Sequence, residues 1–123
     1  MSEPSGQRLF TPLALRGVSL PNRIVVSPMQ TYAAADDGVA NDWHFQHLAK
    51  YAVGGSGLVF TEVLLVEPRG RNTHFDLGLW SDEQIAPLAR IAEFLKANGA
   101  VPGAQIGHSG AKAARQRPWK GLQ

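Results

Sequence analysis

Residues 23–32, with the sequence RIVVSPMQTY, join a strand-like run directly to a proline. The β-branched residues favour a buried strand. Pro28 ends that strand, because proline has no N–H to give to a sheet ladder. Gln30 and Tyr32 therefore come just beyond the C-terminal end of a strand, which is where α/β folds bind their ligands. We expect this segment to lie at the functional site of an α/β protein.

Strand-like and helix-like segments alternate along the chain. Strands are predicted over residues 24–27, 57–63 and 100–106, and helices over residues 41–53 and 81–98. This order predicts a parallel sheet with right-handed crossovers. The outer strands of such a sheet are open and apolar, so the chain does not resemble a finished domain.

Both helices have a recognisable start and an apolar face. Asn41 is a good N-cap for the first helix, and SDEQ at residues 81–84 matches a capping box for the second. Pro87 fits the second helix only near its first turn or with a kink. The residues expected to face the core are Phe45, Leu48, Ala49 and Ala52 in the first helix and Ile85, Leu88, Ala92 and Leu95 in the second.

The remaining segments are predicted to be connections. Residues 9–20 alternate apolar with polar or small residues and read as a short hairpin or an extended cover. Residues 64–80 form a long connection, and a loop of this length in a compact domain is usually functional. Residues 1–8 are a polar lead that we expect to be disordered, and they hold no apolar core of a signal peptide.

Composition excludes several classes of function. The 123 residues contain no cysteine, which rules out a disulfide framework, a thiol nucleophile and thiolate metal sites. No apolar run approaches the roughly 20 residues of a membrane span, so we expect a cytoplasmic protein with no membrane partner. The net charge is +2, and the basic residues after Glu93 have no regularly interleaved aromatics, so a nucleic-acid partner is not expected.

Two histidines, His44 and His47, are close together on the predicted first helix. Such a spacing can hold a metal ion, but no third ligand is in view. We therefore expect packing or surface roles for them, and no metal site. Trp43, Trp80 and Trp119 are most simply packing residues.

Several motifs follow one another in an order that matches a known family. They are LFTP at 9–12, LPNRIVVSPM at 20–29, GLVFTE at 57–62, PRGR at 68–71, DLGLWSD at 76–82, QIGHSGAKA at 105–113 and PW at 118–119. With these motifs the chain resembles the N-terminal third of the old yellow enzyme family, in particular its bacterial xenobiotic-reductase branch. The resemblance covers residues 9–121, and so many ordered motifs are a far stronger signal than any single one.

The resemblance implies both a fold and a chemistry. It implies a (β/α)8 TIM barrel with one FMN at its C-terminal face, in which residues 9–123 form the N-terminal portion and supply about three of the eight βα units. It also implies an oxidoreductase in which NADPH or NADH reduces FMN. Flavin N5 then passes a hydride to the activated C=C bond of an α,β-unsaturated carbonyl or nitro compound, which is an ene-reductase reaction.

The resemblance assigns ligand contacts to matched residues only. The segment beside the flavin ring, near N5 and O4, is matched by Ser27, Pro28, Met29 and Gln30. Val63 falls where a backbone N–H meets the flavin O4, and Gln105 matches a glutamine that reads the pyrimidine edge with its donor and acceptor. Tyr32 matches a tyrosine on the substrate side, whose phenol can donate to a carbonyl oxygen.

Some positions depart from the family pattern. Cysteine or threonine is common at the position of Gln30, and a small residue at that of Val63. An amide can donate the same hydrogen bond near O4 but is not redox-active, so redox sensing through a thiol is not expected. The resemblance also includes His108, expected to be structural, and Lys112, which either supports the electron-rich edge of the flavin or is solvated.

Other family features fall past Gln123, among them the substrate-anchoring His pair or His and Asn, the proton-donating tyrosine and the phosphate-binding loops. We therefore assign no catalytic residue here, and expect the isolated chain to be inactive and to bind FMN weakly or not at all. The full-length protein is expected to form a homo-oligomer, or a second chain to complete the barrel. Two alternatives remain open: a related flavin-barrel enzyme (a dienoyl-CoA reductase, an amine demethylase or the reductase part of a CoA-ester fusion), and a non-catalytic barrel fragment.

Overall fold

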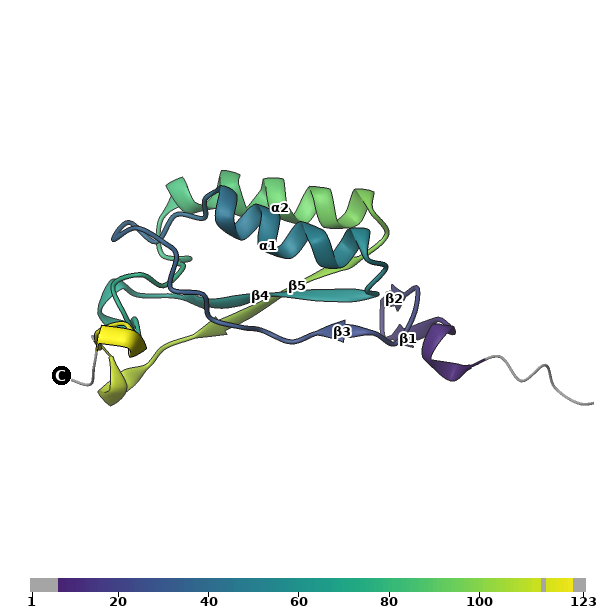
Figure 1. Cartoon of the computed structure of the whole chain (residues 1–123), viewed down its shortest axis with the longest axis horizontal. Helices are drawn as coiled ribbons and strands as arrows, with labels where there is room; N and C mark the ends of the chain where they lie inside the picture. Colours follow the sequence, from purple (N-terminus) through teal and green to yellow (C-terminus); the bar gives the residue numbers. More distant parts are fainter. Residues whose placement is uncertain (1–6, 114, 121–123) are drawn as a thin grey trace, which may run out of the picture.

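The computed structural model describes residues 7–113 and 115–120. Its centre is a three-stranded parallel sheet in the order β3-β4-β5, with two helices packed on one face (Figure 1). The elements are β3 (Val25–Val26), α1 (Asp42–Val53), β4 (Leu58–Leu65), α2 (Ile85–Ala97) and β5 (Val101–Gly107). The predicted alternation of strands and helices is confirmed, with boundaries that shift by at most a few residues.

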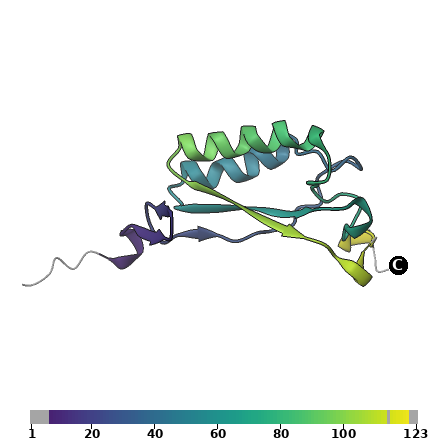
Figure 2. The same ribbon diagram turned by 180° about the vertical axis from the view of Figure 1, so that it is seen from behind.

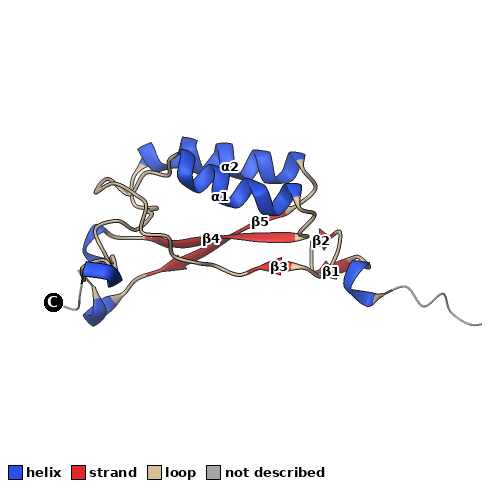
Figure 3. Ribbon diagram, in the orientation of Figure 1, coloured by secondary structure: helices blue, strands red, loops and turns tan. Residues whose placement is uncertain are grey.

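Both views place α1 and α2 side by side on the same face of the sheet, whereas no described element covers the opposite face (Figures 1 and 2). The predicted hairpin forms as β1 (Leu13–Leu15) and β2 (Val18–Leu20), paired antiparallel. It lies at the end of the sheet where the strands begin, and short 3₁₀ turns lie at the other end (Figure 3). The two ends of the sheet are therefore distinct: the hairpin marks the N-terminal end of the parallel strands, and the opposite end is their C-terminal end.

Arg8–Phe10 form a 3₁₀ turn, so the predicted disordered lead does not extend through Arg8. Residues 1–6 of that lead lie outside the described part of the chain. Within residues 7–113 and 115–120, no helix has the length and apolar character needed to cross a bilayer.

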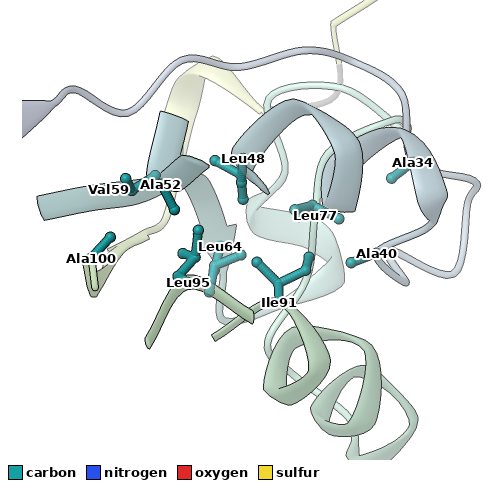
Figure 4. Close-up of a cluster of buried hydrophobic side chains, with 10 residues drawn as sticks. All are labelled: Ala34, Ala40, Leu48, Ala52, Val59, Leu64, Leu77, Ile91, Leu95 and Ala100. Carbon is teal, nitrogen blue, oxygen red and sulfur yellow. The ribbon is translucent and has the colours of Figure 1, made fainter. Parts of the chain in front are cut away.

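The hydrophobic core lies between the helices and the middle strand (Figure 4). Its largest members are Leu48 from α1, Leu64 from β4, Ile91 and Leu95 from α2, and Leu77 from the loop after β4. Burying a side chain of this size stabilises the fold by about 1.5–3 kcal/mol. The core therefore fixes α1 and α2 to β4, the middle strand, which pairs with both β3 and β5.

One predicted core position is wrong. Ile85 is 54% exposed. Ile91, which the pattern did not assign to the core, is only 3% exposed and belongs to it. Ile85 is the first residue of α2 and directly follows a 3₁₀ turn at Asp82–Gln84. Ile85 is thus at the N-terminal end of α2, and the face of the helix that packs on the core begins with Leu88 and continues through Ile91 and Leu95. Pro87 is tolerated because it lies in the first turn of α2.

His44 belongs to the start of α1. The Asn41 side chain accepts a hydrogen bond from the Trp43 N–H at 3.0 Å, and His44 Nδ1 accepts one from the Asn41 N–H at 3.1 Å. Burial, together with the neighbouring charge of His47, lowers the pKa of His44 to about 4, so the ring is neutral. His47 stacks on Trp43. Both histidines have packing roles, and among the described residues no group of three or more potential ligands could hold a metal ion.

Replacing Asn41 tests this account of α1. Asn41→Ala removes the acceptor for the Trp43 N–H, and loss of such a cap costs about 1 kcal/mol of stability. Urea unfolding of the complete protein measures it. The control is Gln46→Ala, which changes an exposed residue of the same helix and should leave stability nearly unchanged. Equal effects of the two variants would contradict the capping role.

Candidate functional site

The parallel sheet brings the predicted ligand-binding residues to one end. Val63 and Gln105 are register partners on neighbouring strands. Ser27 to Gln30 follow β3 outside its strand pairing, and the next residue, Thr31, hydrogen-bonds to Glu62 beside Val63. The Ser-Pro-Met segment, Val63 and Gln105 therefore converge where the strands finish, as the sequence predicted.

A β-bulge in β4 shapes this end of the sheet. Phe60 pairs with Gly103 and Val63 with Gln105, so β4 has one more residue than β5 over the same stretch. Bulges of this kind re-aim side chains and are frequent next to functional sites. Beyond the bulge, a Cβ on Gly107 would come within 2.7 Å of Val63 Cγ2. The absence of a side chain at Gly107 thus lets β5 lie close to Val63.

The bulge contains Glu62, a buried acid that carried no predicted role. Its Oε2 accepts hydrogen bonds from the Thr31 N–H at 3.1 Å and the Thr31 hydroxyl at 2.6 Å. Its Oε1 is buried and has no partner among the described residues. Burial raises the pKa of Glu62 to about 7, against the opposing hydrogen bonds from Thr31. The sequence signal for it was an acidic residue inside an otherwise apolar strand.

A second buried acid, Asp76, organises the long loop after β4. Its Oδ2 accepts the Thr73 N–H at 2.9 Å, and its Oδ1 accepts the Thr73 hydroxyl at 2.8 Å and the Gln30 amide. The Gln30 Oε1 in turn lies 3.4 Å from Asn72 Nδ2. One N–H of the Gln30 amide is therefore engaged by Asp76, and the other makes no side-chain hydrogen bond within the described part of the chain. The prediction that this loop has a functional role gains a physical basis, because it holds Gln30.

Tyr32 is held in an unusual backbone conformation. Its φ is 56°, in the left-handed region that few non-glycine residues adopt. Such strain is concentrated at functional sites. Tyr32 lines a cavity of about 260 Å³ together with Gln30, Asn72, Thr73, Arg115, Gln116 and Pro118. The rings of Tyr32 and Trp119 meet edge to face with centroids 5.6 Å apart, so Trp119 packs against Tyr32 at the surface.

Two further matched residues have different surroundings. His108 accepts a hydrogen bond from the Gly110 N–H at 3.0 Å and lies 3.2 Å from Glu67. A Cβ on Gly70 would meet its ring at 2.4 Å, so His108 is packed against the loop, in agreement with a structural role. Lys112 is exposed.

These features define the class of site. Consecutive parallel βα units place a proline-terminated segment, a buried acid and an exposed amide at the C-terminal ends of the strands, which is the ligand-binding end of a (β/α)8 barrel. Over residues 8–120 the chain matches the model of the NADH:flavin oxidoreductase / NADH oxidase family. The chain belongs to this family.

Individual relatives agree with this assignment. The chain is 47% identical over 107 residues to an NADPH dehydrogenase of Listeria monocytogenes, and 45% identical over 107 residues to one of Bacillus pumilus. Each alignment covers 86% of this chain and 32% of the relative. The chain thus spans about a third of the length of the curated relatives it matches.

Solved structures give the same fold. The old yellow enzyme from Trypanosoma cruzi superposes with a TM-score of 0.76 at 27% identity, over 86% of this chain and 28% of that one. Morphinone reductase in complex with tetrahydroNAD gives 0.75 at 29% identity, over 88% and 29%. The prediction of the N-terminal part of a (β/α)8 barrel is confirmed, as is the old yellow enzyme family. FMN and a reduced nicotinamide, the predicted cofactors, are the ones this family implies.

The described residues fit a planar flavin. The side chain of Gln105 is exposed and makes no hydrogen bond within the described part of the chain, so its amide can pair with a pyrimidine edge. Ser27 and Met29 are also exposed, and they lie outside the strand ladder. Backbone groups free of the ladder need other partners. Both the free amide and the free backbone are groups that a polar heterocycle can satisfy.

Asp76→Ala tests the network beneath the site. It removes the acceptor for Gln30 and for both Thr73 donors, and an unsatisfied buried donor costs about 1–3 kcal/mol. We expect a loss of at least that size in denaturant unfolding of the complete protein. The matched control is Asp42→Ala, whose side chain is 91% exposed. A loss no greater than that of the control would contradict the role of Asp76.

Proposed function

We propose that the complete protein is an FMN-dependent ene-reductase that uses NADPH or NADH. Bound FMN would supply hydride transfer from the nicotinamide to the β-carbon of an α,β-unsaturated carbonyl or nitro compound, with a proton added at the α-carbon. One observation carries the proposal: Ser27–Gln30, Val63 and Gln105 meet at the C-terminal end of the parallel strands. The family and the NADPH dehydrogenases among its relatives support a flavin oxidoreductase of this kind.

The residues of this chain would hold and orient the cofactor. The segment Ser27–Gln30 would lie along the ring, with backbone groups and one amide N–H of Gln30 near its polar side. The backbone N–H of Val63 would donate to O4. The Gln105 amide would offer a donor and an acceptor to the pyrimidine edge. Val63 and Gln105 belong to paired strands, and Ser27–Gln30 are held through the bonds of Gln30 and Thr31 to buried acids. Such support favours exact placement of a reactive ring.

Tyr32 would act on the substrate side. Its phenol borders the cavity of about 260 Å³, and it can donate a hydrogen bond to the carbonyl oxygen of an enone. That bond withdraws electron density from the conjugated alkene and so favours addition of a hydride at the β-carbon. The same bond fixes which carbon faces the flavin.

The direct test is a spectrum followed by an assay. The complete protein should purify with the visible absorption of oxidised FMN, and under anaerobic conditions it should oxidise NADPH or NADH when cyclohexenone is added, with the saturated ketone as product. Absence of bound flavin would overturn the flavin proposal. Flavin reduction without turnover of any activated alkene would overturn the ene-reductase proposal alone.

Gln105→Ala addresses the cofactor contact. It removes a donor and an acceptor from the pyrimidine edge, and since each hydrogen bond contributes about 0.5–1.5 kcal/mol, the Kd for FMN should rise by roughly 10-fold or more. Fluorescence quenching of FMN added to the deflavinated complete protein measures the Kd. Gln46→Ala, on the outer face of α1, is the control, and an unchanged Kd in Gln105→Ala would contradict the contact.

Tyr32→Phe addresses the substrate. Loss of one hydrogen bond should lower kcat/KM for cyclohexenone by about 2- to 10-fold. The Kd for FMN should not change, because the proposed partner of the phenol is the substrate. Tyr51→Phe on α1 changes the same group far from the cavity and should have no effect. An equal loss in both variants would show that the Tyr32 phenol has no special role.

A further inference from the structure

Glu62 is a buried carboxyl that the proposed function does not use. Only 4% of its surface is exposed. Its Oε2 accepts two hydrogen bonds from Thr31, and its Oε1 is buried without a partner among the described residues. An ionised carboxylate with one oxygen unsatisfied in such a place is costly. The neutral acid avoids most of this cost.

The surroundings of Glu62 contain one other acid and no compensating base. Asp76, from the loop after β4, raises the pKa of Glu62 by its charge, and Thr31, from the segment after β3, lowers it by two hydrogen bonds. On the β5 side, residues 103–107 (GAQIG) include no titratable group. No arginine, lysine or histidine of the described residues contributes to the shift.

The two acids differ in how many of their oxygens accept hydrogen bonds. Both oxygens of Asp76 accept hydrogen bonds, from Thr73 and Gln30. Only one oxygen of Glu62 does. Because donors favour the ionised form of a carboxyl group, the unpaired Oε1 of Glu62 leaves its carboxylate incompletely stabilised. This geometry favours the protonated form of Glu62.

Glu62 also connects the two backbone segments of the proposed flavin site. It precedes Val63 on β4, and its partner Thr31 lies between Gln30 and Tyr32. Ionisation would strengthen the two bonds from Thr31, since charged acceptors bind donors about twice as strongly. It would also repel Asp76, which holds Gln30. A change of charge on Glu62 thus acts on both segments at once.

We propose that Glu62 gains and loses a proton near neutral pH and is a positioning residue whose ionisation alters the contacts of residues 27–32 and Val63 with the flavin. The effect on the flavin rests on the proposed function. The protonation of Glu62 follows from the contacts of this chain alone. The consequence is a flavin environment that depends on pH through a group that does not touch the substrate.

The first experiment titrates the visible band of oxidised FMN in the complete protein. Between about pH 5.5 and pH 8.5, a range around the pKa of about 7, the oxidised ring does not itself ionise, so a shift of the band reports a protein group. We expect one single-proton transition, and its loss in Glu62→Gln. Thr31→Val removes the hydroxyl donor and should move the transition to higher pH. The control Glu67→Gln, at an acid of the loop, should leave it in place.

The second experiment separates the proton from the flavin. Infrared spectra of the protein without flavin should show the carbonyl stretch of a protonated carboxyl group at about pH 5.5, lost by about pH 8.5 and absent in Glu62→Gln. A missing band, or one that survives this substitution, overturns the proposal. So does a flavin band that titrates identically in wild type and Glu62→Gln. Should Glu62→Gln fail to fold, an unshifted transition in Thr31→Val overturns it. A protein that shows the infrared band but binds no FMN retains the buried proton and refutes the proposed function instead.

Discussion

The parallel pairing of β4 with both of its neighbours is the constraint on which the site depends. Val25 and Val26 pair with Leu58 and Val59, and the other edge of β4 pairs with β5 up to Gly107. Because all three strands run in the same direction, everything that follows them emerges at one end. The core beneath α1 and α2 holds β4 in place (Figure 4). The packing of α1 and α2 on one face of the sheet therefore holds β4 in the position from which the polar residues at the C-terminal end of the strands extend.

The polar groups at that end are held by two buried acids rather than by strand pairing. β3 has only two paired residues, so Ser27–Gln30 depend on bonds made further along. Glu62 anchors Thr31, and Asp76 anchors Gln30 and the turn at Thr73. Each acid connects segments that are more than 30 residues apart in the sequence. Asp76 also closes the turn that begins at Thr73. A sheet end built this way can keep its backbone groups available for a ligand without losing its shape.

Sequence periodicity was sufficient for the elements and not for the tertiary contacts. The helices and strands follow from local patterns, because a buried strand or an amphipathic helix has a regular signature. The convergence of Gln30, Val63 and Gln105 was implied by the family resemblance. The bulge at Glu62, the bond from Gln30 to Asp76 and the exposure of Ile85 follow from neither. They depend on register, on partners distant in the sequence and on where along α2 the core-facing side begins, none of which leaves a periodic trace.

The positive φ of Tyr32 restricts how this site can be altered by design. Glycine, asparagine and aspartate adopt a left-handed backbone at little cost, whereas β-branched side chains do so with the most strain. A library that varies position 32 is therefore expected to lose its valine, isoleucine and threonine members to poor folding, whatever their effect on selectivity. Diversity is better introduced at Gln116 and Pro118, which line the same cavity and have no such backbone restriction.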